Sequence, residues 1–143
     1  MGTEQNQTAK LLVRYPDTAY EAHGNYGVEY NLTMPLSNNT TKNQTVAITL
    51  ETPLKEDKLS KGSLRFRQPS LDFPFFRGTV RLRYTDDQGK KVTRYVHLWH
   101  RTGQILEPLL EVNIPAKGNL LVQLDVIYPP DSTPPHTVTI KTK

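Results

Sequence analysis

Strict alternation of apolar and polar residues in several short segments is the feature that most limits what this chain can fold into. Residues 44–50 place valine, isoleucine and leucine at every second position. Residues 119–128 are apolar at every second position as far as Val126, with Gln123 and Asp125 on the opposite face. Successive side chains of a strand point to opposite sides of a sheet, so each segment has one buried face. This pattern is typical of antiparallel sheets packed face to face.

The rest of the chain favours strands as well. Helical periodicity is scarce, and eleven prolines interrupt the sequence in a way that indicates short strands separated by turns. We expect strands at residues 9–15, 27–36, 44–52, 63–67, 76–85, 91–101, 108–115, 119–128 and 136–142. The sequence therefore predicts an all-β fold, an antiparallel β-sandwich of the immunoglobulin-like or jelly-roll-like kind with about eight or nine strands.

The length of 143 residues suits a single domain that can bury a core without disulfides. We expect residues 9–143 to form this domain and residues 1–8 to be a disordered or non-native lead. The chain has no cysteine, which excludes disulfides, thiolate metal sites and cysteine nucleophiles. No apolar stretch reaches the roughly 20 residues of a membrane span.

Residues 75–101 give the strongest local signal, that of a β-hairpin. The turn Asp87-Gln88-Gly89 suits a three-residue loop with Gly89 in the left-handed conformation. Pairing Asp86 with Lys90 would then fix the register of both strands. One face of the hairpin would be largely apolar, and the other would carry cations and aromatic rings.

That second face contains the candidate ligand-binding residues. They are Arg77, Arg81, Arg83, Tyr95, His97 and Trp99. Guanidinium groups stack on aromatic rings, contributing on the order of 0.5 to 1 kcal/mol at exposed sites, so the face could simply reinforce the sheet. A flat surface of rings and hydrogen-bond donors could equally bind sugar rings or unstacked bases. The sequence leaves both interpretations open.

Charge is concentrated around the same hairpin. Residues 61–101 contain ten Lys or Arg and three Asp or Glu, whereas the rest of the chain contains eight and eleven. Such a patch favours anionic partners. It could also consist of solvated strand positions that protect against edge pairing. The modest net charge of +4 makes nucleic acid a poor candidate partner.

No catalytic constellation is visible. The serines lie in no nucleophile elbow, and there is no glycine-rich phosphate loop. His97 and His100 are three residues apart on an expected strand and would point to opposite faces, which does not suit paired metal ligands. We therefore expect a protein that is not an enzyme, with no metal site and no cofactor.

Long stretches of the chain resemble a known family. LLVRYPDTAYEAHGNYGVEYNLTMPLSNNT, TPLKEDKLSKGSLRF, FFRGTVRLRYTDDQGKKVTRYVHL and LVQLDVIYPPDSTPP are similar to the C-terminal part of a cyanobacterial family of secreted proteins of unknown function. The resemblance implies a larger exported precursor and a periplasmic or cell-surface location. It implies no activity, cofactor or site residue.

The expected function combines these observations. The chain would be a non-catalytic module of a cell-envelope protein that binds or scaffolds through its basic and aromatic face. Its partners would be an anionic polysaccharide, an envelope protein or the rest of its own precursor. The alternative is a purely structural terminal domain without a ligand, and a nucleic-acid binder or a hydrolase is less well supported.

Overall fold

The computed structural model describes residues 8–11, 13, 15–17, 20–23, 27–54, 64–70, 72, 74–130, 132 and 134–143. The described residues form strands, turns and loops, without a helix. The strands are β1 (Thr8–Lys10), β2 (Glu21–His23), β3 (Glu29–Ser37), β4 (Gln44–Glu51), β5 (Pro74–Thr85), β6 (Lys91–Arg101), β7 (Leu110–Ile114), β8 (Asn119–Ile127) and β9 (Thr137–Thr142). The all-β prediction is confirmed.

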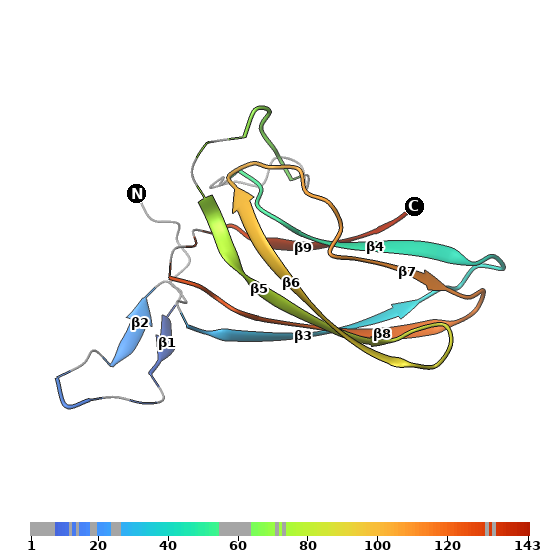
Figure 1. The fold of residues 1–143 in the computed structure, drawn as a ribbon, viewed down its shortest axis with the longest axis horizontal. Coiled ribbons are helices and arrows are strands. Elements are labelled where there is room, and N and C mark those ends of the chain that lie inside the picture. The colour runs from blue at the N-terminus through green and yellow to red at the C-terminus, as the bar shows by residue number, and fades with distance from the viewer. Residues whose placement is uncertain are drawn as a thin grey trace.

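Seven of these strands make two antiparallel sheets, which are sandwich-like in arrangement. One sheet has the order β3-β8-β5-β6 and the other the order β7-β4-β9, while β1 and β2 pair only with each other. Figure 1 shows β9, β4 and β7 as a layer above β3 and β8. The core between the layers is formed by inward-facing side chains such as Ile48, Val80, Leu82 and Leu124, all with no exposed surface.

The expectation of eight or nine strands in the sandwich is wrong for the described part of the chain, where the two sheets have seven. The segment expected at 63–67 is not a strand over residues 64–67. Its backbone bonds to two different loops, at Leu54 and Gly103, so it has no single neighbouring strand. The segment expected at 9–15 contributes only to β1. Residues 1–7 of the expected lead lie outside the described residues, and Thr8 already belongs to β1.

A buried asparagine ties two turns together at one end of the sandwich. Asn38, after β3, is 5% exposed. Its amide nitrogen, which carries two hydrogens, lies within hydrogen-bond distance of the carbonyl oxygens of Lys42 (2.8 Å), Ile114 (3.0 Å) and Pro115 (3.0 Å). Its side-chain oxygen accepts from the backbone nitrogen of Thr40 at 3.0 Å and from the Thr40 hydroxyl at 2.8 Å. These bonds join the turn between β3 and β4 to the end of β7, and Asn38 and Ile114 are 76 residues apart in the sequence.

An aromatic cluster lies at the end of β5 and β6 that is farthest from the hairpin turn. His100, on β6, is 5% exposed and lies 6.0 Å from the ring of Phe76. The Phe76 ring is in turn 5.0 Å from that of His136, whose Nδ1 is 2.9 Å from the hydroxyl of Tyr128. Burial, and to a smaller extent the charge of the nearby His136, together lower the pKa of His100 to about 4.

The buried His100 makes stability depend on pH. Because its folded-state pKa is about 4 and an unfolded histidine has a pKa of about 6.5, the stability contributed by its neutral form is lost as pH falls from about 6.5 to 4. We expect His100→Leu to reduce the fall in unfolding free energy between pH 7 and pH 5 by on the order of 1 kcal/mol. Urea unfolding at both pH values measures it. The exposed His97 provides the control His97→Gln, and an equal pH dependence in wild type and His100→Leu would contradict the assignment.

Within the described residues, no helix is long and apolar enough to span a lipid bilayer.

Candidate functional site

The hairpin of β5 and β6 has the register that its turn predicts. Asp86 donates its backbone N–H to the carbonyl of Lys90 at 2.9 Å, and Gly89 has a φ of 77°, in the left-handed region that glycine adopts at little cost. The side chain of Asp86 also accepts the backbone N–H of Lys90 at 2.8 Å. The turn is therefore determined by local sequence, and it aligns all the residues that follow on both strands.

This register brings the six candidate residues together on one face of the hairpin. Arg77 lies opposite Trp99, Thr79 opposite His97, Arg81 opposite Tyr95 and Arg83 opposite Thr93. All six have odd numbers, and the even-numbered neighbours Val80 and Leu82 are fully buried on the other side. The predicted division of the hairpin into an apolar face and a basic-aromatic face is correct. We call the odd-numbered side of β5 and β6 the outer face.

The two largest rings of the outer face are open to solvent. Tyr95 is 61% exposed and Trp99 is 47% exposed, so neither ring is covered by the second sheet. Leu121 and Ile127, on the outer side of β8, are 52% and 61% exposed. Exposed apolar side chains of this size, gathered on one sheet, offer a contact surface to a partner.

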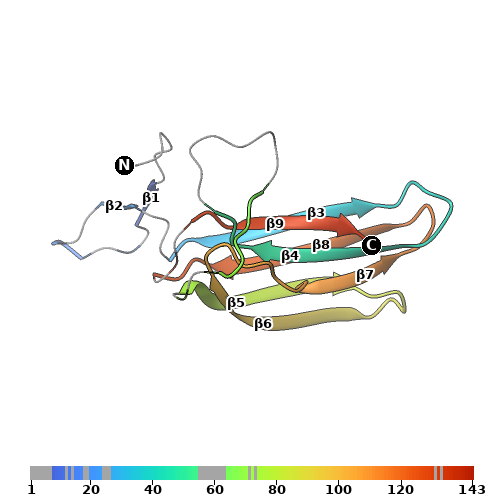
Figure 2. The same ribbon diagram turned by 90° about the horizontal axis from the view of Figure 1, so that it is seen from above.

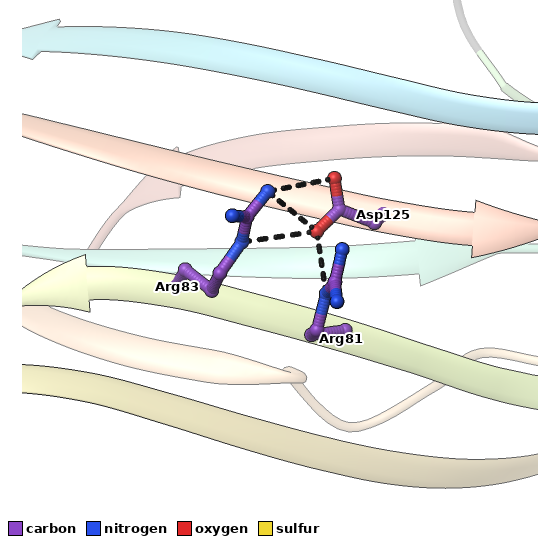
Figure 3. A network of polar contacts seen from close by, with 3 residues as sticks. All are labelled: Arg81, Arg83 and Asp125. Atoms are coloured by element: carbon purple, nitrogen blue, oxygen red, sulfur yellow. Dashed lines mark hydrogen bonds and ion pairs between the residues drawn. The ribbon is translucent and has the colours of Figure 1, made fainter.

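A buried carboxylate contacts two of the arginines, as Figure 3 shows. Asp125, on β8, lies directly opposite Arg81 in the pairing of β5 with β8. Its Oδ2 atom is 2.9 Å from Nε of Arg81 and 3.0 Å from Nη2 of Arg83. The Asp125 side chain is 6% exposed, whereas those of Arg81 and Arg83 are 37% and 40% exposed. Two cations thus share one anion, and a positive charge remains at this point of the surface.

The contacts of Arg81 favour its protonated, positively charged form. The hydrogen bond to Asp125 raises the pKa of Arg81 above its ordinary value, and a hydrogen bond with Tyr95 acts in the same direction. The predicted pairing of Arg81 with Tyr95 across the hairpin is therefore accompanied by a polar contact. The guanidinium bridges β6, β5 and β8 and remains partly accessible.

The remaining contacts are distributed along β6. The hydroxyl of Thr79 is 2.7 Å from Nδ1 of His97. The guanidinium carbon of Arg101 lies 4.9 Å from the centre of the Trp99 ring, and its Nη1 is 3.4 Å from the exposed carboxylate of Asp72. Arg101, two residues further along the same strand, thus stacks on Trp99. Contacts within β6 therefore contribute to the organisation of this face together with the pairing of β5 and β6.

Asp125 is the residue of this face that the sequence pattern did not identify as a partner of the arginines. Alternation placed it correctly on the polar side of its strand, opposite Leu124 and Val126. It did not indicate that β8 would lie beside β5, because these strands are far apart in the sequence. A hollow of about 320 Å³ lies beside the carboxylate, lined by Glu29, Thr79, Arg81, Tyr95, Asp125, Val126 and Ile127. It is a shallow depression of the outer face.

Comparison with known proteins places the chain in a family. The model of the family described as "Protein of unknown function (DUF3370)" matches residues 1–142. The chain belongs to this family. No curated protein and no solved structure matches it. The resemblance noted in the sequence is thus correct as to an uncharacterised family.

Proposed function

We propose that this member of the family is a non-catalytic binding module whose outer face contacts an anionic polysaccharide or an acidic protein surface. The observation that carries the proposal is the presence of two solvent-exposed rings, Tyr95 and Trp99, beside arginines whose charge exceeds that of their one buried carboxylate. Aromatic rings pack against the apolar faces of sugars, and guanidinium groups form paired hydrogen bonds with carboxylates and sulfates. The outer face presents both kinds of group within one sheet.

The cellular location of the protein is part of the same proposal. The resemblance to secreted cyanobacterial proteins supports a periplasmic or cell-surface location, where acidic polysaccharides and envelope proteins are the available partners. The rest of a precursor chain is a further partner.

The second candidate is a purely structural domain, and the Asp125 contacts favour it. Two of the six candidate residues, Arg81 and Arg83, already have a partner within the sheet. Their contacts join β5 to β8, which stabilises the sheet without any ligand. In that case Tyr95 and Trp99 would cover the strands below them and bind nothing.

A retention experiment separates the two functions. The protein is passed over immobilised alginate, a carboxylated polysaccharide, and over neutral dextran at low and moderate salt. We expect retention on alginate only, with a several-fold loss in Trp99→Ala and in Arg77→Gln, and a weaker interaction as salt rises. Exposed guanidinium groups contribute little to folding, so the melting temperature of Arg77→Gln should change little.

Two matched variants control for hydrophobicity and charge. Ile140, on β9, is 45% exposed, and Ile140→Ala removes an exposed apolar side chain away from the outer face. Arg94 lies on β6 but on the other side of the strand, so Arg94→Gln removes the same charge from the same hairpin. Equal retention of all variants, or no retention of the wild type, would support the structural alternative.

A further inference from the structure

The free edge of β6 is the second surface of interest. β6 is the last strand of its sheet, and Figure 2 shows it along the border of the molecule, outside the three-stranded sheet. An edge strand presents backbone N–H and C=O groups that can pair with another extended chain. Whether an edge is available depends on its length, its prolines and its charges.

Of the edge strands in the described residues, β6 is the longest and has no proline. It has 11 residues, against nine in β3, six in β9 and five in β7. Pro35 interrupts the hydrogen-bonding capacity of β3, because proline has no N–H to donate. β6 also keeps a regular register with β5 over its whole length up to the irregularity at Pro74.

The outward groups of β6 belong to its odd-numbered residues. In an antiparallel pair, residues alternate between bonding to the neighbour and pointing away from it. The bond from Asp86 to Lys90 assigns the even-numbered residues to β5. Arg101 agrees with this alternation, because its N–H donates to Gln104 at 2.9 Å and its carbonyl accepts from the Thr52 hydroxyl at 2.7 Å. The backbone groups of Thr93, Tyr95, His97 and Trp99 are left facing outward.

The positive charges of β6 favour an acidic strand over a second copy of this chain as the partner. The strand KVTRYVHLWHR contains two arginines, one lysine and no acidic residue. If two copies paired antiparallel about Val96, Lys91 would lie opposite Arg101 of the second copy, and like charges directly opposite are destabilising. Arg94 is exposed and points to the inner side, where an inward charge also discourages self-pairing. An acidic strand would meet attraction at the same positions.

The inner side of β6 favours apolar side chains on the partner strand. Val96 and Leu98 face the core but are only partly buried, because the three-stranded sheet does not extend beneath the edge. An added strand with apolar residues on this side would cover them. Its outer side would lie beside Tyr95 and Trp99.

We propose that β6 binds an extended acidic segment of a partner protein, which adds to the sheet as a further antiparallel strand along residues 91–99. One acidic residue of the segment lies opposite Lys91 on the outer side and another lies opposite Arg94 on the inner side, while β-branched apolar residues occupy the other inner positions. Backbone hydrogen bonds supply the affinity, and the alternating side chains supply the selectivity. This interaction uses the backbone of β6 and does not depend on polysaccharide binding by the outer face.

The test uses the peptide Glu-Val-Thr-Val-Glu-Glu-Thr-Val-Glu with blocked ends, at low salt, so that its sixth and ninth residues lie opposite Arg94 and Lys91. Trp99 is the single tryptophan of the chain, so its fluorescence reports binding beside the edge. We expect saturable binding, and at least tenfold weaker binding of two control peptides. One has lysine in place of glutamate, and the other has methylated amides at alternate positions, which blocks pairing while the side chains are retained. Equal binding of the methylated peptide, or no binding of the acidic one, would overturn the proposal.

A variant pair tests the edge on the protein side. Thr93→Pro removes one outward N–H without breaking the ladder to β5 and should weaken peptide binding tenfold or more, while Thr93→Val retains the N–H and should bind as wild type does. Amide exchange gives an independent measurement on the wild-type protein. The amides of Tyr95, His97 and Trp99 should become protected when peptide is added, and unchanged exchange with bound peptide would also overturn the proposal. Alginate retention of Thr93→Pro reports separately on the outer face.

Discussion

Asp125→Asn is expected to destabilise the protein and at the same time to strengthen its retention on anionic polysaccharide. The carboxylate is buried and pairs with Arg81 and Arg83, so removal of its charge leaves two guanidinium groups without their anion. Breaking a fully buried ion pair costs about 3 to 5 kcal/mol. Because both arginines are partly exposed and can be hydrated, we expect a smaller loss of about 1 to 2 kcal/mol.

The gain in binding has the same cause. The two guanidinium groups no longer share a carboxylate, and the outer face gains one unit of positive charge. Alginate retention should therefore persist to higher salt than in the wild type. Urea unfolding and salt elution measure the two effects on the same sample.

Asp87→Asn is the matched control for this variant. It changes the net charge by the same amount, but Asp87 is exposed in the hairpin turn. It should alter neither stability nor retention appreciably. A loss of stability in Asp125→Asn without any gain in retention would support the purely structural role, and unchanged stability would show that the two arginines need no partner.

Asn38→Ala is expected to cost about 2 to 3 kcal/mol of unfolding free energy. The side chain is buried, and its removal leaves the carbonyl of Ile114 and the backbone N–H of Thr40 without their donor and acceptor. Each buried polar group that loses its partner costs about 1 to 3 kcal/mol. Chemical denaturation measures the loss.

The neighbouring asparagine supplies the control. Asn39 is exposed, and its contact with Lys117 uses the backbone carbonyl, which Asn39→Ala preserves. This variant should unfold as the wild type does. If the two variants were equally stable, the bonds of Asn38 would contribute nothing beyond what water supplies.

The sequence was informative wherever the responsible interactions are local. Asp86 and Gly89 determine the hairpin turn, and the turn determines which residues of β5 and β6 face each other. The grouping of Arg77, Tyr95 and Trp99 on one face follows from that register, since side chains alternate along a strand. The all-β class follows from the same alternation, repeated in other segments.

The sequence was less informative about strands that lack a strong pattern. Residues 64–67 have the composition of a strand, but their backbone bonds to separate loops. A strand requires a continuous neighbour, and composition does not show whether one is present. The same limitation applies to the strand expected at residues 9–15, of which only residues 9 and 10 belong to β1.

Tertiary structure alone decided which strands are neighbours, and therefore which charges meet. Asp125 lies 44 residues from Arg81 along the chain, and Asn38 lies 76 residues from Ile114. No periodicity within one strand specifies such contacts, because they depend on the order of strands in the sheet and on the packing of two layers. The sequence determined the composition of the outer face and of the β6 edge. The fold determined that one buried carboxylate contacts two of the arginines of that face, and that β6 is the last strand of its sheet among the described residues.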